Sequence, residues 1–266
     1  MRVVRRVPFT TAVVVVMIVV GVVSGALWTA AEDQSWWPEV AYGVPSLAAG
    51  RWWTLLTGPF LAIAPWAYGF MVGSFALFAG WCEWRLGTRF TAWYVPVTQL
   101  GSVLVAAGLL AAAGATGWEW ASRTTATLDV GFSAGSMAAV AMLTALAPPP
   151  WRLRLRVALA LYVVTSLLFE GTLADVEHLV AVLAGFAAGP WADRRFGGPP
   201  SRPVAVRERV ALLAGVVVLL AGAGPVLGAV LPSPGPLGDT GVVVWPQVVV
   251  AAVAVPLVAG LFRSAG

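Results

Sequence analysis

The chain has 266 residues, of which 59% are hydrophobic and only 11% are charged. A soluble domain carries about 25% charged residues, so most of this surface must face lipid or neighbouring helices. The net charge of +4 does not indicate nucleic-acid binding, because all sixteen basic residues are arginines that lie in a few loops. The absence of lysine and the many Ala, Val, Gly and Pro residues are typical of a GC-rich bacterial genome.

The sequence also excludes several kinds of site. It has one cysteine and one histidine, so these residues cannot form a cluster for a structural zinc ion. Cys82 has no partner for an internal disulfide, and no phosphate-binding loop or dinucleotide fingerprint occurs. We therefore predict neither a metal nor a cofactor.

Charged residues divide the chain into eight apolar segments, each long enough to cross a membrane as a helix. The predicted limits are 8–30, 64–82, 91–113, 130–148, 153–170, 174–192, 210–231 and 241–262. The fifth segment is the weakest, and Arg154 and Arg156 at its start must extend their side chains to the membrane surface. We predict an all-α fold, a polytopic bundle of membrane helices.

The distribution of arginine predicts the orientation, because inner loops of membrane proteins are rich in basic residues. With the N-terminus in the cytoplasm, fourteen arginines lie inside and only Arg51 and Arg123 lie outside. Most acidic residues lie outside in the same arrangement. We expect a multi-pass protein of the cell membrane with both termini in the cytoplasm.

The spans and loops predict three parts. Residues 1–192 form a six-span core, in which the Trp-rich segment 31–63 lies on or in the outer membrane interface. Residues 193–209 form a basic inner linker that contains proline and glycine. Residues 210–266 form a two-span extension, to which we assign no chemistry.

Two side chains suggest chemistry at the outer surface. Ser133 follows Asp129 at the outer start of the fourth predicted span, and His178, the only histidine, lies at the outer start of the sixth. Both therefore lie at a similar depth. A serine hydroxyl needs a base to become a good nucleophile, and imidazole has a suitable pKa of about 6.5. The pair predicts hydrolysis close to the outer membrane face, where water has access.

Small residues on both helices predict the close packing that a Ser–His contact requires. They include Ala134 after the serine, and Ala181 and Gly185 after the histidine. A structural interpretation also exists, because a membrane histidine can join helices and a serine can bond to a carbonyl of its own helix. Ser136 is a rival nucleophile, but it lacks the preceding Gly-x and lies about 300° around the helix from Ser133.

Four blocks, in this order, resemble the rhomboid family of intramembrane serine proteases. They are Gly50-Arg-Trp-Trp-Thr-Leu-Leu-Thr57, Gly80-Trp-Cys-Glu-Trp-Arg-Leu-Gly-Thr88, Gly131-Phe-Ser-Ala134 and His178 with Gly185 seven residues later. The resemblance covers roughly residues 8–192. It implies a nucleophilic Ser133, a general base His178, no third catalytic acid, no cofactor, and cleavage of transmembrane segments near the outer face.

The chain departs from the family pattern where side chains support the oxyanion. The family places His and Asn in the second span, at positions that hold Ala67 and Met71 here, and the glycine after the serine is Ala134. Tyr68 is the nearest polar side chain, if the register slips by one residue. We therefore consider Tyr68, Gly131 and backbone N–H groups such as that of Ser133 as oxyanion supports.

Three functions follow from these patterns. We predict an intramembrane serine protease whose partners are transmembrane protein substrates and the lipid bilayer, with no nucleic acid. The alternative is a catalytically inactive rhomboid-like protein that binds membrane clients, which the altered oxyanion positions favour. A transporter or channel is the third, although we find no ionisable group near mid-membrane and no clear inverted repeat.

Overall fold

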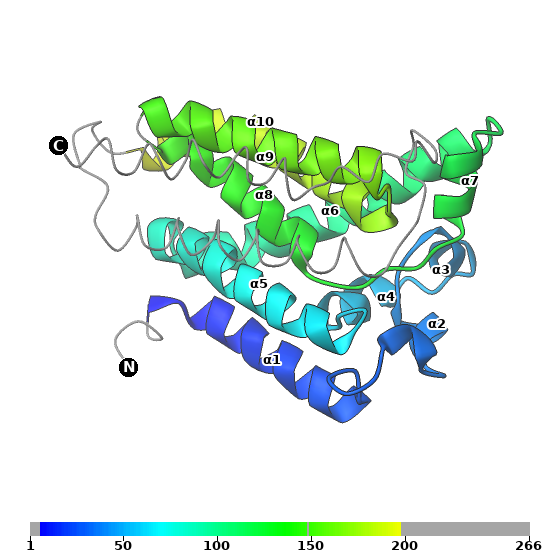
Figure 1. Cartoon of the computed structure of the whole chain (residues 1–266). Helices are drawn as coiled ribbons and strands as arrows, with labels where there is room; N and C mark the ends of the chain where they lie inside the picture. The colour runs from blue at the N-terminus through cyan, green and yellow to red at the C-terminus, as the bar shows by residue number, and fades with distance from the viewer. Residues whose placement is uncertain (1–5, 148, 198–266) are drawn as a thin grey trace.

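The computed structural model describes residues 6–147 and 149–197, and all regular elements in this part are helices. The helices form an all-α bundle, as the sequence predicts (Figure 1). The bundle consists of α1 (Pro8–Ser24), α5 (Pro65–Leu86), α6 (Thr88–Gly114), α8 (Ser133–Leu143), α9 (Pro149–Phe169) and α10 (Leu173–Phe196).

Shorter helices lie in the connections. Three of them, α2, α3 and α4, lie with α7 towards one end of the bundle (Figure 1). Their limits are α2 (Trp37–Val40), α3 (Val44–Ala48), α4 (Thr54–Thr57) and α7 (Glu119–Thr125), with 3-10 turns at Ala31–Asp33, Gly58–Phe60 and Thr144–Leu146. The Trp-rich segment 31–63 is therefore a chain of short helices and turns.

Each of the first six predicted spans overlaps one of the bundle helices. The first helix ends at Ser24, earlier than predicted, because Gly25 adopts a φ of +79° that closes the helix. The fourth helix ends at Leu143 and continues as a 3-10 turn. The predicted spans 210–231 and 241–262 lie outside the described residues.

By length and apolar composition, only α6 and α10 of the described helices are each able to cross a membrane alone. The segments Thr54–Phe60 and Pro65–Leu86, which meet at an angle of 95°, add a third crossing if they count as one bent span. Helix α1 and the segment Ser133–Leu146 are apolar but shorter. Six crossings for this part of the chain therefore remain a prediction.

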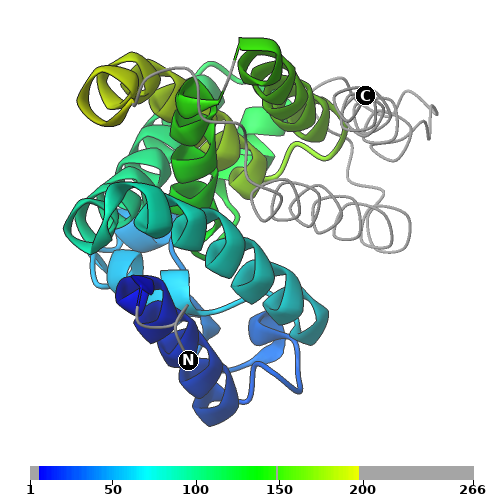
Figure 2. The same ribbon diagram turned by 90° about the vertical axis from the view of Figure 1, so that its left-hand side faces the viewer.

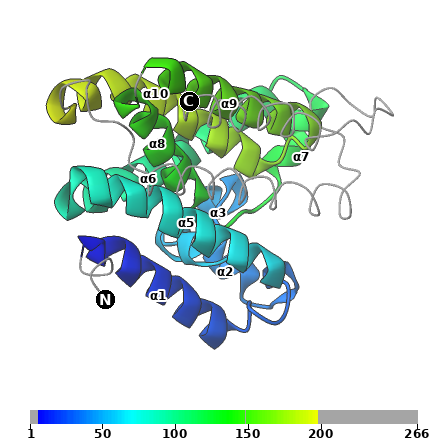
Figure 3. The same cartoon turned by 60° about the vertical axis from the view of Figure 1, so that its left-hand side comes forward.

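Helix α8 lies at the centre of the bundle, between α5 and α10 (Figures 1 and 3), and also packs against α6. Every residue from Ala134 to Leu143 is buried, which its many small side chains permit. Helix α1 lies at the edge of the bundle against α5 (Figure 2), and α9 packs against α10. Helix α8 is thereby enclosed by α5, α6 and α10.

Glu83 joins the two helices at this edge. Its buried carboxylate accepts hydrogen bonds from the N–H of Phe9 at 2.9 Å, the N–H of Thr10 at 2.8 Å and the Thr10 hydroxyl at 2.7 Å. These N–H groups belong to the first turn of α1, where no carbonyl is available one turn back. Glu83 therefore has a structural role, as the helix cap of a neighbouring element.

The basic start of α9 packs in part against its neighbours. Arg156 donates to the Thr144 hydroxyl at 3.2 Å, and its guanidinium lies 5.7 Å from the centre of the Phe186 ring. Arg152 forms an ion pair with Asp193 at 3.5 Å. The expectation that Arg156 simply extends to the membrane surface is therefore incomplete, because its charged group packs between two elements.

Candidate active site

Ser133 is the first residue of α8, where the N–H groups of the first turn have no carbonyl one turn back. Gly131 makes the turn before it, with a φ of +123° that L side chains rarely adopt. A Cβ atom at Gly131 would lie 3.9 Å from the Ser133 Oγ. The conformation of this turn, rather than a lack of space, therefore favours glycine.

His178 lies in the second turn of α10, which begins with a capping box. The Thr172 hydroxyl accepts a hydrogen bond from the N–H of Asp175 at 3.3 Å, and Asp175 accepts one from the N–H of Thr172 at 2.8 Å. The Ser166 hydroxyl also donates to Asp175. The Asp175 carboxylate thus fixes the start of the helix that carries His178.

The two side chains meet across the helices. His178 Nε2 lies 2.8 Å from Ser133 Oγ, which is a hydrogen-bond distance. The imidazole tautomer with its proton on Nδ1 lets Nε2 accept the hydroxyl hydrogen. Nδ1 is buried and bonds to no other residue in the described part of the chain. The arrangement there is a Ser–His pair without a third member.

Close packing of α8 against α10 makes this contact possible. A Cβ atom at Gly185 would lie 2.4 Å from the carbonyl oxygen of Ala138 and 2.6 Å from the Cβ of Ala141. Both Ala134 and Ala181 are fully buried. The small residues that the sequence places on these helices therefore lie where the backbones approach most closely.

Ser136 has a different role from Ser133. Its hydroxyl donates to the carbonyl of Phe132, one turn back, at 3.0 Å. The side chain is buried within α8, which is the structural use of serine that we considered for both residues. The rival nucleophile is therefore bonded to its own helix.

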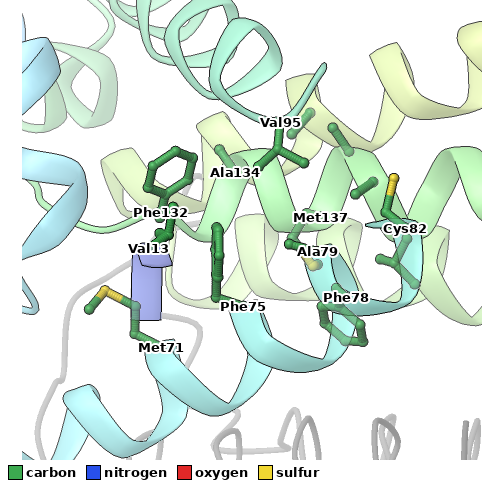
Figure 4. Close-up of a cluster of buried hydrophobic side chains, with 14 of the residues drawn as sticks. Val13, Met71, Phe75, Phe78, Ala79, Cys82, Val95, Phe132, Ala134 and Met137 are labelled. Carbon is green, nitrogen blue, oxygen red and sulfur yellow. The ribbon is translucent and has the colours of Figure 1, made fainter. Parts of the chain in front are cut away.

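Aromatic packing anchors the residue between Gly131 and Ser133. The Phe132 ring is buried and lies 5.1 Å from the Phe75 ring and 5.9 Å from the Phe60 ring, both in edge-on geometry. Figure 4 shows Phe132 at the start of α8 beside Phe75 and Met71 of α5. These contacts hold the turn against the second long helix of the bundle.

Two polar side chains, which the sequence analysis does not single out, hold the same turn. Gln99, buried on α6, donates from Nε2 to the carbonyl of Gly131 at 2.9 Å and accepts from the N–H of Gly135 at 2.8 Å. The Tyr42 hydroxyl donates to the same Gly131 carbonyl at 3.0 Å. The sequence offers one indication that Gln99 is functional, because it is a polar amide within a predicted apolar span. Nothing in the sequence points to Tyr42.

Acidic groups surround this polar cluster. Tyr42 and Asp129 exchange two backbone hydrogen bonds, of 3.0 and 2.8 Å. Burial raises the pKa of Tyr42 well above its usual value, and the nearby acids Glu177 and Asp129 raise it further. Asp129 is partly exposed. The protein atoms around its carboxyl nevertheless shield it from water and raise its pKa to about 7. Glu177 is buried, and its Oε1 bonds to no other described residue.

A sequence model of the family described as rhomboid-like proteins matches residues 55–197, more than half of the chain. The chain belongs to this family. The comparisons found no match among curated proteins and none among solved structures. The segment typical of rhomboid-like proteins thus runs from α4 to just past α10 and includes both Ser133 and His178.

This rhomboid-like chain has apolar residues, Ala67 and Met71, at the two positions where the family resemblance leads us to expect oxyanion donors. Of these, Met71 reaches the site, because its Sδ would lie 3.7 Å from a Cβ atom at Gly131. Tyr68 faces α1, where its ring would lie 2.8 Å from a Cβ atom at Gly21, and its hydroxyl bonds to no described residue. The side chain beside Gly131 is therefore Met71 rather than Tyr68.

Backbone N–H groups remain near the Ser133 hydroxyl. The N–H of Gly135 is bonded to Gln99, whereas those of Phe132, Ser133 and Ala134 donate to no other described residue. The described part of the chain contains no group of three or more His, Cys, Asp or Glu residues placed to hold a metal ion. The chemistry available here comes from a hydroxyl, an imidazole and a helix N-terminus.

Proposed function

We propose that the chain is an intramembrane serine protease that hydrolyses peptide bonds in or next to the transmembrane segments of other membrane proteins. The observation that carries the proposal is the 2.8 Å contact between Ser133 Oγ and His178 Nε2. Membership of the rhomboid-like family supports it. The proposed substrates are single-span or multi-span membrane proteins that present an unwound segment near the outer face.

In the proposed reaction, Ser133 Oγ attacks the scissile carbonyl carbon while its proton moves to His178 Nε2. The imidazolium then gives that proton to the nitrogen of the leaving amine, and the C–N bond breaks to leave an acyl-enzyme. A water molecule attacks the ester carbonyl, again losing a proton to Nε2. Return of this proton to Ser133 Oγ releases the acid product and restores the enzyme.

The oxyanion of the tetrahedral intermediate binds to backbone N–H groups in this proposal. The N–H groups of Phe132, Ser133 and Ala134 lie at the N-terminus of α8, where the helix dipole also favours negative charge. No side-chain donor is required. Loss of one oxyanion donor costs roughly 10²–10³-fold in rate, so we expect slower turnover than a site with additional side-chain donors would support.

We further propose the membrane arrangement predicted from the sequence. The core, residues 1–192, crosses the cell membrane six times with both termini of the chain in the cytoplasm, and segment 31–63 lies at the outer interface. Ser133 and His178 then lie just below the outer face. The two C-terminal spans in residues 210–266 complete the multi-pass protein.

The first test is cleavage of a membrane substrate by the purified full-length protein in liposomes. A synthetic single-span peptide, with a fluorophore and a quencher on either side of its outer juxtamembrane region, reports hydrolysis. We expect Ser133→Ala and His178→Ala each to lower the rate by at least about 10²-fold. The matched control, Ser136→Ala, removes a buried hydroxyl three residues further along the same helix and keeps the parent rate within about threefold.

The result that contradicts the proposal is equal cleavage by the parent and both variants, or no cleavage by any of them. The second outcome favours the alternative function, a rhomboid-like protein that binds membrane clients without cleaving them. One specific observation favours this alternative: Ala67 and Met71 occupy the positions where the resemblance leads us to expect polar donors. Co-purification of membrane clients with the Ser133→Ala variant would then measure binding directly.

A further inference from the structure

Gln99 bridges two parts of the backbone around Ser133 with one side-chain amide. Its Nε2 donates to the carbonyl of Gly131, two residues before the serine, and its Oε1 accepts from the N–H of Gly135, two residues after it. The side chain is 1% exposed, so water does not compete for these bonds. Gln99 therefore fixes the ends of the five-residue segment that contains Ser133.

Tyr42 reinforces one end of this bridge from a different part of the chain. Its hydroxyl donates to the Gly131 carbonyl, which thereby accepts two hydrogen bonds from two buried side chains. The backbone of Tyr42 is itself paired with that of Asp129. The outer segment before α4 is thus tied directly to the turn that presents Ser133.

The orientation of the Gly131 carbonyl matters because of the peptide group that it shares with Phe132. In a trans peptide the C=O and the next N–H point in opposite directions. Two donors that hold the Gly131 carbonyl on the α6 side therefore turn the Phe132 N–H away from α6. Glycine at φ +123° leaves this peptide freedom to rotate, and the two hydrogen bonds to its carbonyl favour the observed orientation.

The bridge also selects which N–H groups stay available. Gln99 takes the N–H of Gly135, whereas those of Phe132, Ser133 and Ala134 bond to no other described residue. We infer that Gln99 and Tyr42 are positioning residues that align these backbone N–H groups and the Ser133 hydroxyl with the developing oxyanion. This inference rests on the proposed protease function, and it explains how a site without side-chain donors is organised for catalysis.

Two substitutions test the inference in the full-length protein. Gln99→Met keeps the length of the side chain and removes both hydrogen bonds, and Tyr42→Phe removes only the hydroxyl. Because misplacement of a reacting group by about 1 Å costs roughly 10²-fold, we expect Gln99→Met to lower kcat by about 10²-fold and Tyr42→Phe by about tenfold. KM for the single-span fluorogenic peptide stays within about twofold in both variants.

The matched control is Tyr94→Phe. Tyr94 is also a buried tyrosine whose hydroxyl approaches a carbonyl of α8, but that carbonyl belongs to Ala138 and the distance is 3.5 Å. We expect its kcat to stay within twofold of the parent. A second measurement uses a peptide aldehyde, whose hemiacetal oxygen occupies the oxyanion position. Its inhibition constant rises in the positioning variants in parallel with the loss of kcat, whereas a purely structural role would lower only the folded fraction.

The outcomes separate the inference from the proposed function. The inference alone is overturned by one combination of results. The parent cleaves the peptide in a Ser133-dependent way, but Tyr42→Phe and Gln99→Met cleave at the same rate per folded molecule as Tyr94→Phe. A rise in KM with unchanged kcat also overturns it. No turnover dependent on Ser133 in the parent overturns the proposed function and this inference with it. If Gln99→Met does not fold, Tyr42→Phe alone decides.

Discussion

Asp129 lies just before the Gly131 turn, where surrounding protein atoms shield its carboxyl from water and raise its pKa to about 7 from an ordinary value of 3.8. The folded protein therefore holds this proton more tightly than the unfolded chain does. The resulting stabilisation is fully present below about pH 4 and is lost as the pH rises through about 7. We predict that the contribution of Asp129 to the unfolding temperature in detergent falls across this window.

The Asp129→Asn variant tests this effect, because its side chain cannot ionise. We expect the difference in unfolding temperature between parent and variant to change between about pH 4 and pH 7 and to stay constant above about pH 8. Asp33→Asn, at an exposed acid of the outer segment, serves as the control. A constant difference across the whole range would refute the prediction.

At the residue scale, the sequence predicts the pair of side chains better than their support. Ser133 and His178 could be placed at one depth, because charge patterning orients the spans and each residue stands at a span end. The direction of the Tyr68 side chain could not be predicted, because neighbouring positions on a helix differ by about 100° in direction. Only the packing shows that Tyr68 faces α1. The contacts of Gln99 and Tyr42 with Gly131 join positions far apart in sequence, which no local pattern reveals.

Helix packing sets the distance between the Ser133 and His178 side chains. Gly185 lies where α10 meets the backbone of α8, and a Cβ atom there would overlap the Ala138 carbonyl. We predict that Gly185→Ala separates the helices, lowers the free energy of unfolding by about 1–3 kcal/mol and reduces cleavage at least tenfold. Thermal unfolding and the fluorogenic peptide measure the two effects.

Gly108 supplies the matched control for this substitution. It is also a glycine inside a long helix, α6, but a Cβ atom there would meet no other atom within 4 Å. Gly108→Ala should therefore leave cleavage unchanged and be neutral or slightly stabilising. Similar effects of the two substitutions would mean that the close approach at Gly185 does not control the Ser–His contact.

At the element scale, apolar runs between charges predict where helices occur, whereas their ends depend on local and tertiary contacts. The first helix stops at Ser24 because Gly25 takes a left-handed conformation, although the apolar run continues. The fifth begins at Pro149, before its arginines, one of which, Arg156, contacts Thr144. The capping box at Thr172 and Asp175 is local in sequence, and it sets the start of α10.

At the scale of the whole molecule, the distribution of arginine predicts which end of each helix faces the cytoplasm. The two ends of α6 offer a direct test, because Arg89 and Thr116 are both exposed and lie at opposite ends of this helix. In a Cys82→Ala background, we expect a membrane-impermeant maleimide to label Thr116→Cys in intact cells. Arg89→Cys should react only after the membrane is opened.

Labelling of Arg89→Cys in intact cells, with protection of Thr116→Cys, would reverse the proposed orientation. It would also place Ser133 and His178 near the cytoplasmic face. The number of crossings depends on more than composition, since α1 and α8 are short and α9 begins with arginines. Helix α1 packs against α5, α9 against α10, and α8 against α5, α6 and α10, so packing as well as hydropathy sets their positions in the bundle.

The central claim is that His178 activates Ser133 by accepting its proton. The most direct measurement is the rate at which a fluorophosphonate modifies the purified protein, with the modified residue identified by mass spectrometry. We predict one adduct per molecule, on Ser133, and a rate about 10²–10⁴-fold lower in His178→Ala, because the general base is lost. An unmodified Ser133 in the folded parent, or equal rates in the parent and His178→Ala, would contradict the claim.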